Sequence, residues 1–120
     1  MKKSSTTNPV LKGLIDELIQ ASLKKQTPIW RELAKRLSRS RSGRAQVNVS
    51  RVARFTKKGD TVAIPGKLLG SGVISHPVTV AAFTFSDSAK SKITSAGGEC
   101  IELMDLVAKL PEGTNVRIME

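Results

Sequence analysis

The sequence predicts an α/β fold in which a basic helical part precedes a small layer of alternating strands and helices. Apolar residues recur every three or four positions between residues 9 and 37, which is the period of an amphipathic helix. Beyond residue 60, short β-branched runs alternate with further helical patterns, as in an α/β layer. A length of 120 residues suits one domain with a core of its own. We therefore expect a single domain over residues 1–120, with the basic helical part in 1–58 and the α/β core in 59–120.

Two helices with the same starting signal are predicted in the N-terminal part. Asn8 precedes Pro9, and Thr27 precedes Pro28. The side-chain oxygen of the first residue can accept a hydrogen bond from an amide of the first turn, and a proline at the first helical position has no amide to satisfy. The second helix should end near Leu37, where the apolar period stops.

The segment that follows, SRSRSGR at residues 38–44, has no apolar residue. It cannot contribute to a core, so we expect it to be mobile until its charges are neutralised. An apolar pattern resumes from Val47 to Phe55. This pattern predicts a third short helix that is capped by Asn48 and ends before Lys57.

Strand patterns begin after residue 60. TVAI at residues 61–64 is β-branched and apolar, and Pro65 with Gly66 should close it by a turn. VTVAAFTF at residues 78–85 is the strongest strand pattern in the chain. The elements expected after it are, in order, a helix capped by Ser86 and Asp87 and ended by Gly97 and Gly98, a strand at Glu99–Ile101, a helix with Leu103, Leu106, Val107 and Leu110, a PEGT turn and a final strand NVRIM.

The charge of the chain is large and unevenly distributed. The net charge is +10 and the pI is about 10.3. Residues 1–67 hold 16 Lys and Arg and four acids, net +12, whereas residues 68–120 hold four and six, net −2. Between Arg31 and Lys58 there are ten basic residues and one acid, Glu32. Excess charge of one sign destabilises a compact fold, so it indicates an anionic partner such as nucleic acid or an anionic membrane.

Arginine dominates this basic stretch, and this favours phosphate as the ligand. The planar guanidinium donates two hydrogen bonds to two oxygens and stays charged. The alternative is a solvated surface, but such surfaces mix both signs, and here acids are nearly absent. Of the few aromatic residues, we expect Trp30, Phe83 and Phe85 to pack in the core. With the aromatic residues in the core, the remaining mode of nucleic-acid binding is recognition of the backbone by cations, which is suited to folded RNA.

The sequence excludes several other classes of function. The glycines around Lys67 in VAIPGKLLGSG lack the spacing of a phosphate-binding loop, so Lys67 is expected only as one more phosphate contact. Cys100 is the single cysteine and His76 the single histidine, so we expect Cys100 in a strand, no metal site and no cofactor. No nucleophile has a histidine partner, and no catalytic residue is predicted. The start of the chain lacks the apolar region of a signal peptide, and no segment reaches the ~20 apolar residues of a membrane span.

A DNA-binding alternative stays open at this point. The two N-terminal helices permit a helix-turn-helix or a chromatin-like DNA-binding protein. The cations, however, concentrate after the second helix rather than on its exposed face, where only Arg31, Lys35 and Arg36 support this alternative.

Several segments, in order along nearly the whole chain, resemble one known family. They are TNPVLKGLIDEL, PIWRELAKRL, VNVSRVARF, VAIPGKLLGSG, VTVAAFTFSDSAKSKI and PEGTNVRI. Together they resemble the archaeal and eukaryotic large-subunit ribosomal protein family called eighteen in the eukaryotic-type numbering, which is related to protein fifteen of the bacterial large subunit. The length near 120 residues is similar to that of the archaeal members.

This resemblance implies a structural protein of the large ribosomal subunit, in the cytoplasm, with no enzyme activity. It also implies a basic helical N-terminal part on a small mixed layer of irregular β-β-α turns. The expected partners are large-subunit rRNA and neighbouring ribosomal proteins, with no membrane and no small-molecule substrate. The family's basic segment falls on Arg44, Arg51 and Arg54, and its PGK lysine on Lys67, while the ending IME departs from the basic ending that the family would imply. The residues expected to contact rRNA are Lys2, Lys3, Arg36, Arg39, Arg41, Arg44, Arg51, Arg54, Lys57, Lys58 and Lys67.

Overall fold

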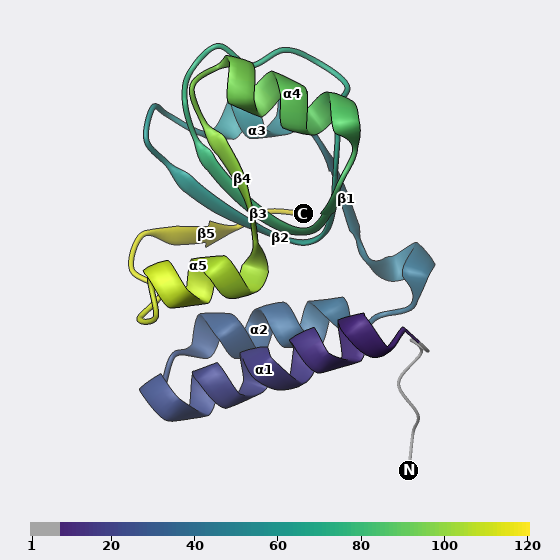
Figure 1. Ribbon diagram of the computed structural model, residues 1–120, viewed down its shortest axis with the longest axis vertical. Coiled ribbons are helices and arrows are strands. Elements are labelled where there is room, and N and C mark those ends of the chain that lie inside the picture. The colour runs from purple at the N-terminus through teal and green to yellow at the C-terminus, as the bar shows by residue number, and fades with distance from the viewer. Residues whose placement is uncertain (1–7) are drawn as a thin grey trace.

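The computed structural model describes residues 8–120 and shows a sheet with helices on both of its faces (Figure 1). The α-helices are α1 Pro9–Lys25, α2 Pro28–Leu37, α3 Val49–Phe55, α4 Asp87–Ser95 and α5 Leu103–Lys109, with a 3₁₀ turn η1 at Arg41–Gly43. The strands are β1 Ala45–Asn48, β2 Thr61–Leu69, β3 Thr79–Phe85, β4 Glu99–Glu102 and β5 Val116–Ile118. The α/β class predicted from the sequence is confirmed.

All the strand pairings of the sheet are parallel. The strands follow the order β1-β2-β3-β4, and β5 also pairs with β2. Along one edge of β2, β5 pairs with residues 61–63 and β1 with residues 66–69, so two short strands share this edge end to end. Parallel strands are usually covered on both faces, and the helices provide that cover here.

The predicted turn at Pro65 and Gly66 is wrong, because β2 continues through both residues. Pro65 lies between the part of β2 that pairs with β5 and the part that pairs with β1, where the register to β3 also shifts. A proline lacks the amide that a ladder needs, so a strand accepts it at such an irregularity. Gly66 is needed because a Cβ there would stand 2.0 Å from the carbonyl oxygen of Ala45. The close backbone approach of β1 and β2 therefore depends on this glycine.

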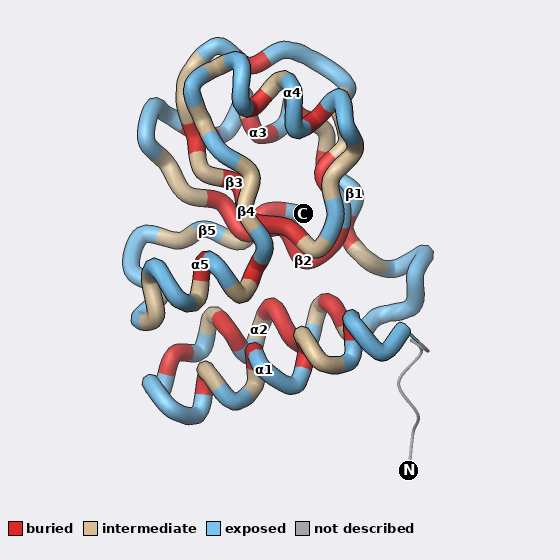
Figure 2. The backbone as a smooth tube through the Cα atoms, in the orientation of Figure 1, coloured by how far each residue is buried: buried red, intermediate tan, exposed pale blue. Residues whose placement is uncertain are grey.

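Alternate residues of the central strands point into two separate cores. Val62 and Ile64 of β2 face α3 and α4, whereas Ala63 faces α1, α2 and α5. The second core is built around Trp30, which is fully buried and donates a hydrogen bond from Nε1 to the carbonyl oxygen of Pro111 at 2.8 Å. Figure 2 shows the buried segments along the strands and on the sides of the helices that face them. The molecule thus has three layers, with helices, sheet and helices in turn.

The capping residues in the sequence predicted the starts of α1 and α4 correctly. The Asn8 side chain accepts hydrogen bonds from the amides of Val10 and Leu11 at the start of α1, and Ser86 accepts one from Ala89 at the start of α4. The short strand and the helix predicted after α4 are β4 and α5, and the NVRIM strand is β5.

One strand was missed. Val47, expected in the third helix, lies in β1, and only the residues after Asn48 form α3. Asn48 stands at the N-cap position as predicted, but its side chain accepts a hydrogen bond from the amide of Ser71 instead of one from the helix.

Candidate nucleic-acid interface

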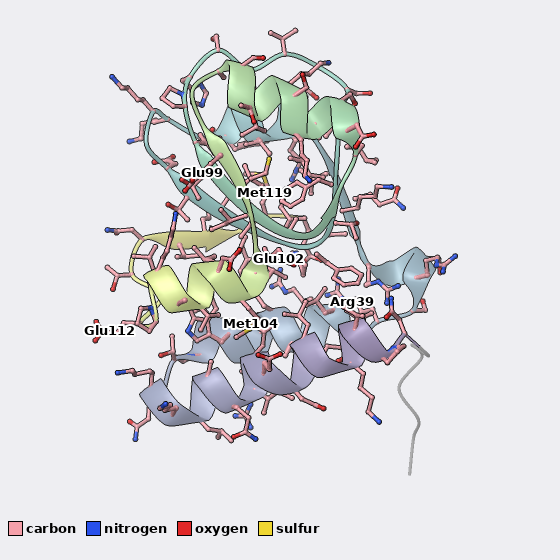
Figure 3. All side chains as sticks on the ribbon, in the orientation of Figure 1. Arg39, Glu99, Glu102, Met104, Glu112 and Met119 are labelled. Carbon is pink, nitrogen blue, oxygen red and sulfur yellow. The ribbon has the colours of Figure 1, made fainter. Side chains whose placement is uncertain are left out.

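Two of the predicted arginines, Arg36 and Arg39, meet a carboxylate at the end of α2. Arg36 donates to Glu32 from Nε at 2.7 Å and to Glu120 from Nη1 at 2.6 Å, and Arg39 donates to the other oxygen of Glu120 at 2.5 Å. We call Arg36 and Arg39 the corner pair. Arg39 lies beside the η1 turn (Figure 3). The hydrogen bond from Arg36 lowers the pKa of Glu32 and raises that of Arg36, so this network favours the charged form of both groups.

The segment after the corner pair has more structure than its composition predicted. Residues Arg41–Gly43 form one 3₁₀ turn, and Arg44 donates from Nη1 to the carbonyl oxygen of Arg39 at 3.0 Å. Arg41 is exposed. Lys67 is also exposed, and its position on β2 is opposite Gln46 of β1, the strand that follows this turn. The PGK lysine therefore lies beside the start of β1, close to where the basic loop enters the sheet.

A second pair of arginines, Arg51 and Arg54, lies on the outer side of α3. Both are exposed, and within residues 8–120 neither forms an ion pair with a carboxylate. Their Cζ atoms lie 5.1 and 5.6 Å from the centroid of the Phe55 ring, a distance at which a cation and a π face attract each other. We call Arg51 and Arg54 the stacked pair.

Phe55 lies in the third helix, as the apolar pattern predicted, but it is exposed. Phe55 keeps 47% of its surface exposed, while Val49 and Val52 of the same helix are fully buried. Helix α3 has only seven residues, and Phe55 is the last of them. The core contacts of α3 are made by Val49 and Val52, and no signal in the sequence separated Phe55 from these buried positions.

Arg117 joins the basic surface from a distant part of the chain. Strand β5 pairs with the start of β2, which brings Arg117 to the end of α3, where it donates to the carbonyl oxygen of Phe55. Arg117 also lies 3.5 Å from Asp60, whose carboxylate accepts a hydrogen bond from the amide of Lys57 at 2.8 Å. A polar pocket of about 530 Å³ opens beside these residues and is lined by both Lys57 and Arg117. The sequence did not indicate Arg117 as part of this surface, because no other basic residue is near it in the sequence and residues 68–120 have a net negative charge.

The structure thus places the predicted cations in two groups. One comprises the corner pair, η1 and Lys67, and the other comprises the stacked pair with the turn that carries Lys57 and Lys58. Strand β1 connects them along the chain. Lys2 and Lys3 lie outside the described residues.

A different surface lies near the start of α1. The first turns of α1, the middle of β3 and the junction of β4 with α5 line a groove of about 480 Å³. Its acidic side chains are Glu17, Glu102 and Asp105, and no Lys or Arg of residues 8–120 lines it. Val10, which is 72% exposed, and the half-buried Phe83 and Met104 give it an apolar lining. We call it the acidic groove.

No chemistry of the catalytic kind is assembled in the described part of the chain. One hydroxyl does have the histidine as a partner, contrary to the prediction, because Thr56 Oγ1 lies 2.8 Å from His76 Nε2. Thr56 is buried, however, and its hydroxyl donates to the carbonyl oxygen of Val52 at 2.5 Å. Residues 8–120 contain no group of three His, Cys, Asp or Glu side chains close enough to hold a metal ion. Cys100 lies in β4, as predicted, and burial raises the pKa of its thiol to about 11, so it stays protonated at neutral pH. Within the same residues no helix has the length and apolar character needed to cross a bilayer.

The helix-turn-helix alternative does not match the arrangement of α1 and α2. The two helices run side by side in nearly opposite directions (Figure 1). In a helix-turn-helix they cross at about 90–120°, and the second helix is free to enter a groove. Here α2 packs on both α1 and β2, and Trp30, Leu33 and Leu37 are buried.

These features define a class, namely a small α/β protein with a basic surface and without a catalytic or metal-binding constellation in residues 8–120. The family model described as "Ribosomal protein 60S L18 and 50S L18e" matches residues 2–120. The chain belongs to this family. It is therefore a structural protein of the large ribosomal subunit, located with the ribosome in the cytoplasm, and not an enzyme.

Curated archaeal proteins are similar over almost their whole length. The chain is 44% identical to the large ribosomal subunit protein eL18 of Methanococcus maripaludis over 119 residues, with 99% of each chain covered. It is 46% identical to the protein of that name from Archaeoglobus fulgidus, again with 99% of each covered, and 45% identical to that of Methanospirillum hungatei, with 98% of each covered.

Proposed function

We propose that this chain binds large-subunit rRNA through its arginine-rich surface. The observation that carries this proposal is the stacked pair with its neighbouring lysines, because these are exposed cations that no carboxylate of residues 8–120 neutralises. Dense positive charge without partners destabilises a small domain, and rRNA phosphate supplies the missing anion. The proposed contact residues are Lys2, Lys3, Arg36, Arg39, Arg41, Arg44, Arg51, Arg54, Lys57, Lys58 and Lys67, to which we add Arg117.

We further propose that the chain acts as a single domain over residues 1–120. The basic helical part in 1–58 and the α/β core in 59–120 share one sheet, because β1 lies before residue 59 and pairs with β2, which lies after it. The core therefore fixes the position of the basic residues on both sides of β1.

The test of rRNA binding is its dependence on salt. Each phosphate contact releases counterions, so engagement of about six cations gives a slope of about −4 to −5 in a plot of log affinity against log salt concentration. Replacing Arg41, Arg44 and Arg51 with Ala should make this slope shallower by about 2 to 3. Filter binding of purified protein to deproteinised large-subunit rRNA measures both quantities.

The matched control removes the same charge elsewhere. Lys12, Lys24 and Lys90 are exposed and lie outside the proposed surface, so their triple Ala variant should keep most of the slope. If both triple variants behaved alike, the charge would act without regard to position, and this assignment of the surface would be wrong.

We infer that neighbouring ribosomal proteins bind elsewhere, at the acidic groove. Its rim of Glu17, Glu102 and Asp105 repels phosphate and attracts cations, and the rest of its lining is apolar. The chemistry that fits is a Lys- or Arg-rich segment of a neighbouring ribosomal protein with an apolar anchor residue. The double variant Glu17→Lys and Asp105→Lys should then leave binding to naked rRNA unweakened and reduce retention on large subunits in a sucrose gradient. Retention equal to that of the unmodified chain would exclude this contact.

A further inference from the structure

We propose that Phe55, together with the stacked pair, forms a site on which one unpaired nucleotide of the RNA stacks. This inference rests on the proposed function and adds the class of nucleotide to it. A run of cations recognises the RNA backbone, whereas an aromatic face recognises a base, so the two parts of the surface have different ligands.

The first observation is that Phe55 differs from the other aromatic residues of the chain. Trp30 is fully buried, and Phe83 and Phe85 are half-buried against the two cores. Of these four aromatic residues, only Phe55 is nearly half exposed, and it lies inside the most basic stretch of the sequence. Exposure of a large apolar ring costs free energy in water, and a partner that covers the ring recovers it.

The second observation is the position of the two guanidinium groups. Arg51 is one helical turn before Phe55, and Arg54 directly precedes it, and both Cζ atoms lie within 6 Å of the ring centroid. Guanidinium planes stack on bases as aromatic rings do, and their charge reaches flanking phosphates. The ring and its two arginines therefore supply a π surface and phosphate donors in one place.

The third observation is that the backbone under the ring is fixed. Arg117 donates to the carbonyl oxygen of Phe55, and the ion pair of Arg117 with Asp60 and the hydrogen bond from Lys57 to Asp60 tie the chain just beyond α3. A platform whose backbone is already fixed loses little conformational entropy when a base stacks on it. The adjacent polar pocket is lined by Lys57 and Arg117 and by Asp60, whose charge Arg117 balances. It has room for the sugar and phosphate next to that base.

The nucleotide must be unpaired, because a base inside a duplex has both faces covered by its neighbours. Bases of loops, bulges and ends are free to stack on protein side chains. The site therefore fits a looped-out base of folded RNA and has no role in contact with a continuous duplex.

The experiment compares four substitutions of Phe55 in binding to deproteinised large-subunit rRNA and to a plain RNA duplex. Phe55→Ala and Phe55→Leu should each weaken rRNA binding by about 5- to 100-fold, while Phe55→Tyr and Phe55→Trp retain it, because only the last two keep a π face. The salt slope should not change, since no charge is removed. Binding to the duplex should be the same for all five proteins. Leu23→Ala is the matched control, because Leu23 is a helical residue that is 61% exposed and lies outside this surface.

A fluorescence measurement gives a second readout. The Trp of Phe55→Trp should be quenched when rRNA binds, and the unmodified chain, in which only the buried Trp30 emits, gives the background. If Phe55→Leu bound rRNA as well as the unmodified chain, the proposal of a stacking site would be wrong. The proposal of salt-dependent rRNA binding would not be affected. Equal losses for all four variants would mean that the ring is not used as a stacking surface, which also overturns the inference. If the unmodified chain itself bound without salt dependence, the proposed function would fail first.

Discussion

The corner pair and the stacked pair come from the same run of arginines, yet the fold gives them opposite surroundings. Arg36 and Arg39 share the carboxylate of Glu120, whereas Arg51 and Arg54 lie against an aromatic ring with no carboxylate in residues 8–120. RNA phosphate must displace an anion at the first pair, while at the second it meets free cations. A count of charges along the sequence therefore overestimates the electrostatic contribution of the corner pair.

The largest effect should follow from breaking the link between the two pairs. Gly66→Ala would place a Cβ 2.0 Å from the carbonyl oxygen of Ala45, in the ladder of β1, which joins the two groups. We expect a loss of about 3 kcal/mol in the free energy of unfolding, since such overpacking cannot be relieved by a side-chain movement. Urea denaturation measures it.

Gly13→Ala is the control for this experiment. A Cβ at Gly13 meets nothing within 4 Å, and the residue lies inside α1, so this variant should be more stable by about 0.5–1 kcal/mol. A Gly66→Ala variant as stable as the unmodified chain would mean that the approach of β1 and β2 adapts easily.

The next effect separates the two pairs directly. The double variant Arg51→Ala and Arg54→Ala should weaken rRNA binding by about 30- to 100-fold, from the loss of two charge-assisted contacts. The double variant Arg36→Ala and Arg39→Ala should lower rRNA affinity by a factor about ten times smaller, because these cations are already paired with Glu120. Filter binding at one salt concentration ranks them, and the reverse order would contradict the comparison.

A smaller effect should appear when Glu120 loses its charge. Glu120→Gln frees the corner pair and should strengthen rRNA binding by about three- to tenfold. The free energy of unfolding should fall by less than about 1 kcal/mol, since the ion pairs are partly exposed. Glu112→Gln makes the same change in net charge at an exposed turn, and its binding should stay nearly unchanged. Equal gains for both variants would show that only net charge matters.

The smallest effect concerns pH. The hydrogen bond from Arg36 lowers the pKa of Glu32 below 4.5 in the folded protein. Because the pKa of Glu32 is lower in the folded state than in the unfolded state, its ionised carboxylate stabilises the folded state at pH values above the unfolded-state pKa. This stabilisation is lost as the pH falls through the folded-state pKa. The Tm of the unmodified chain should therefore exceed that of Glu32→Gln by a small amount above pH 4.5. This Tm difference should vanish in stronger acid, and a difference that grew with acidity would exclude the ion pair as its cause.

Local patterns predicted the ends of the elements better than their pairing. Caps such as Asn8 and Ser86 act within one helical turn, so the sequence around them is sufficient to place α1 and α4. Strand β1 was missed because four residues carry too little periodicity of their own. The turn at Pro65 was wrong because the irregularity in β2 depends on two other strands that share its edge.

The candidate site shows the same limit. The charge run from Arg31 to Lys58 was visible in the sequence. No local signal could predict that Glu120, which lies 84 residues beyond Arg36 in the sequence, forms an ion pair with Arg36. Arg117 and the exposed ring of Phe55 were likewise invisible, since the first depends on the pairing of β5 and the second on how far a seven-residue helix extends over the sheet.

The shared edge of β2 also has a consequence for the chain while it is being made. When residues 1–115 have left the ribosome, Thr61–Ala63 can pair with β3 on one side but still lack β5 on the other, and Arg36 and Arg39 still lack Glu120. An open edge recruits other strands, and unpaired arginines attract any RNA nearby. A product that stops before Val116 would therefore be both prone to aggregation and promiscuous towards nucleic acid. Residues 116–120 therefore cover the open edge of β2 and pair the two arginines at the same time.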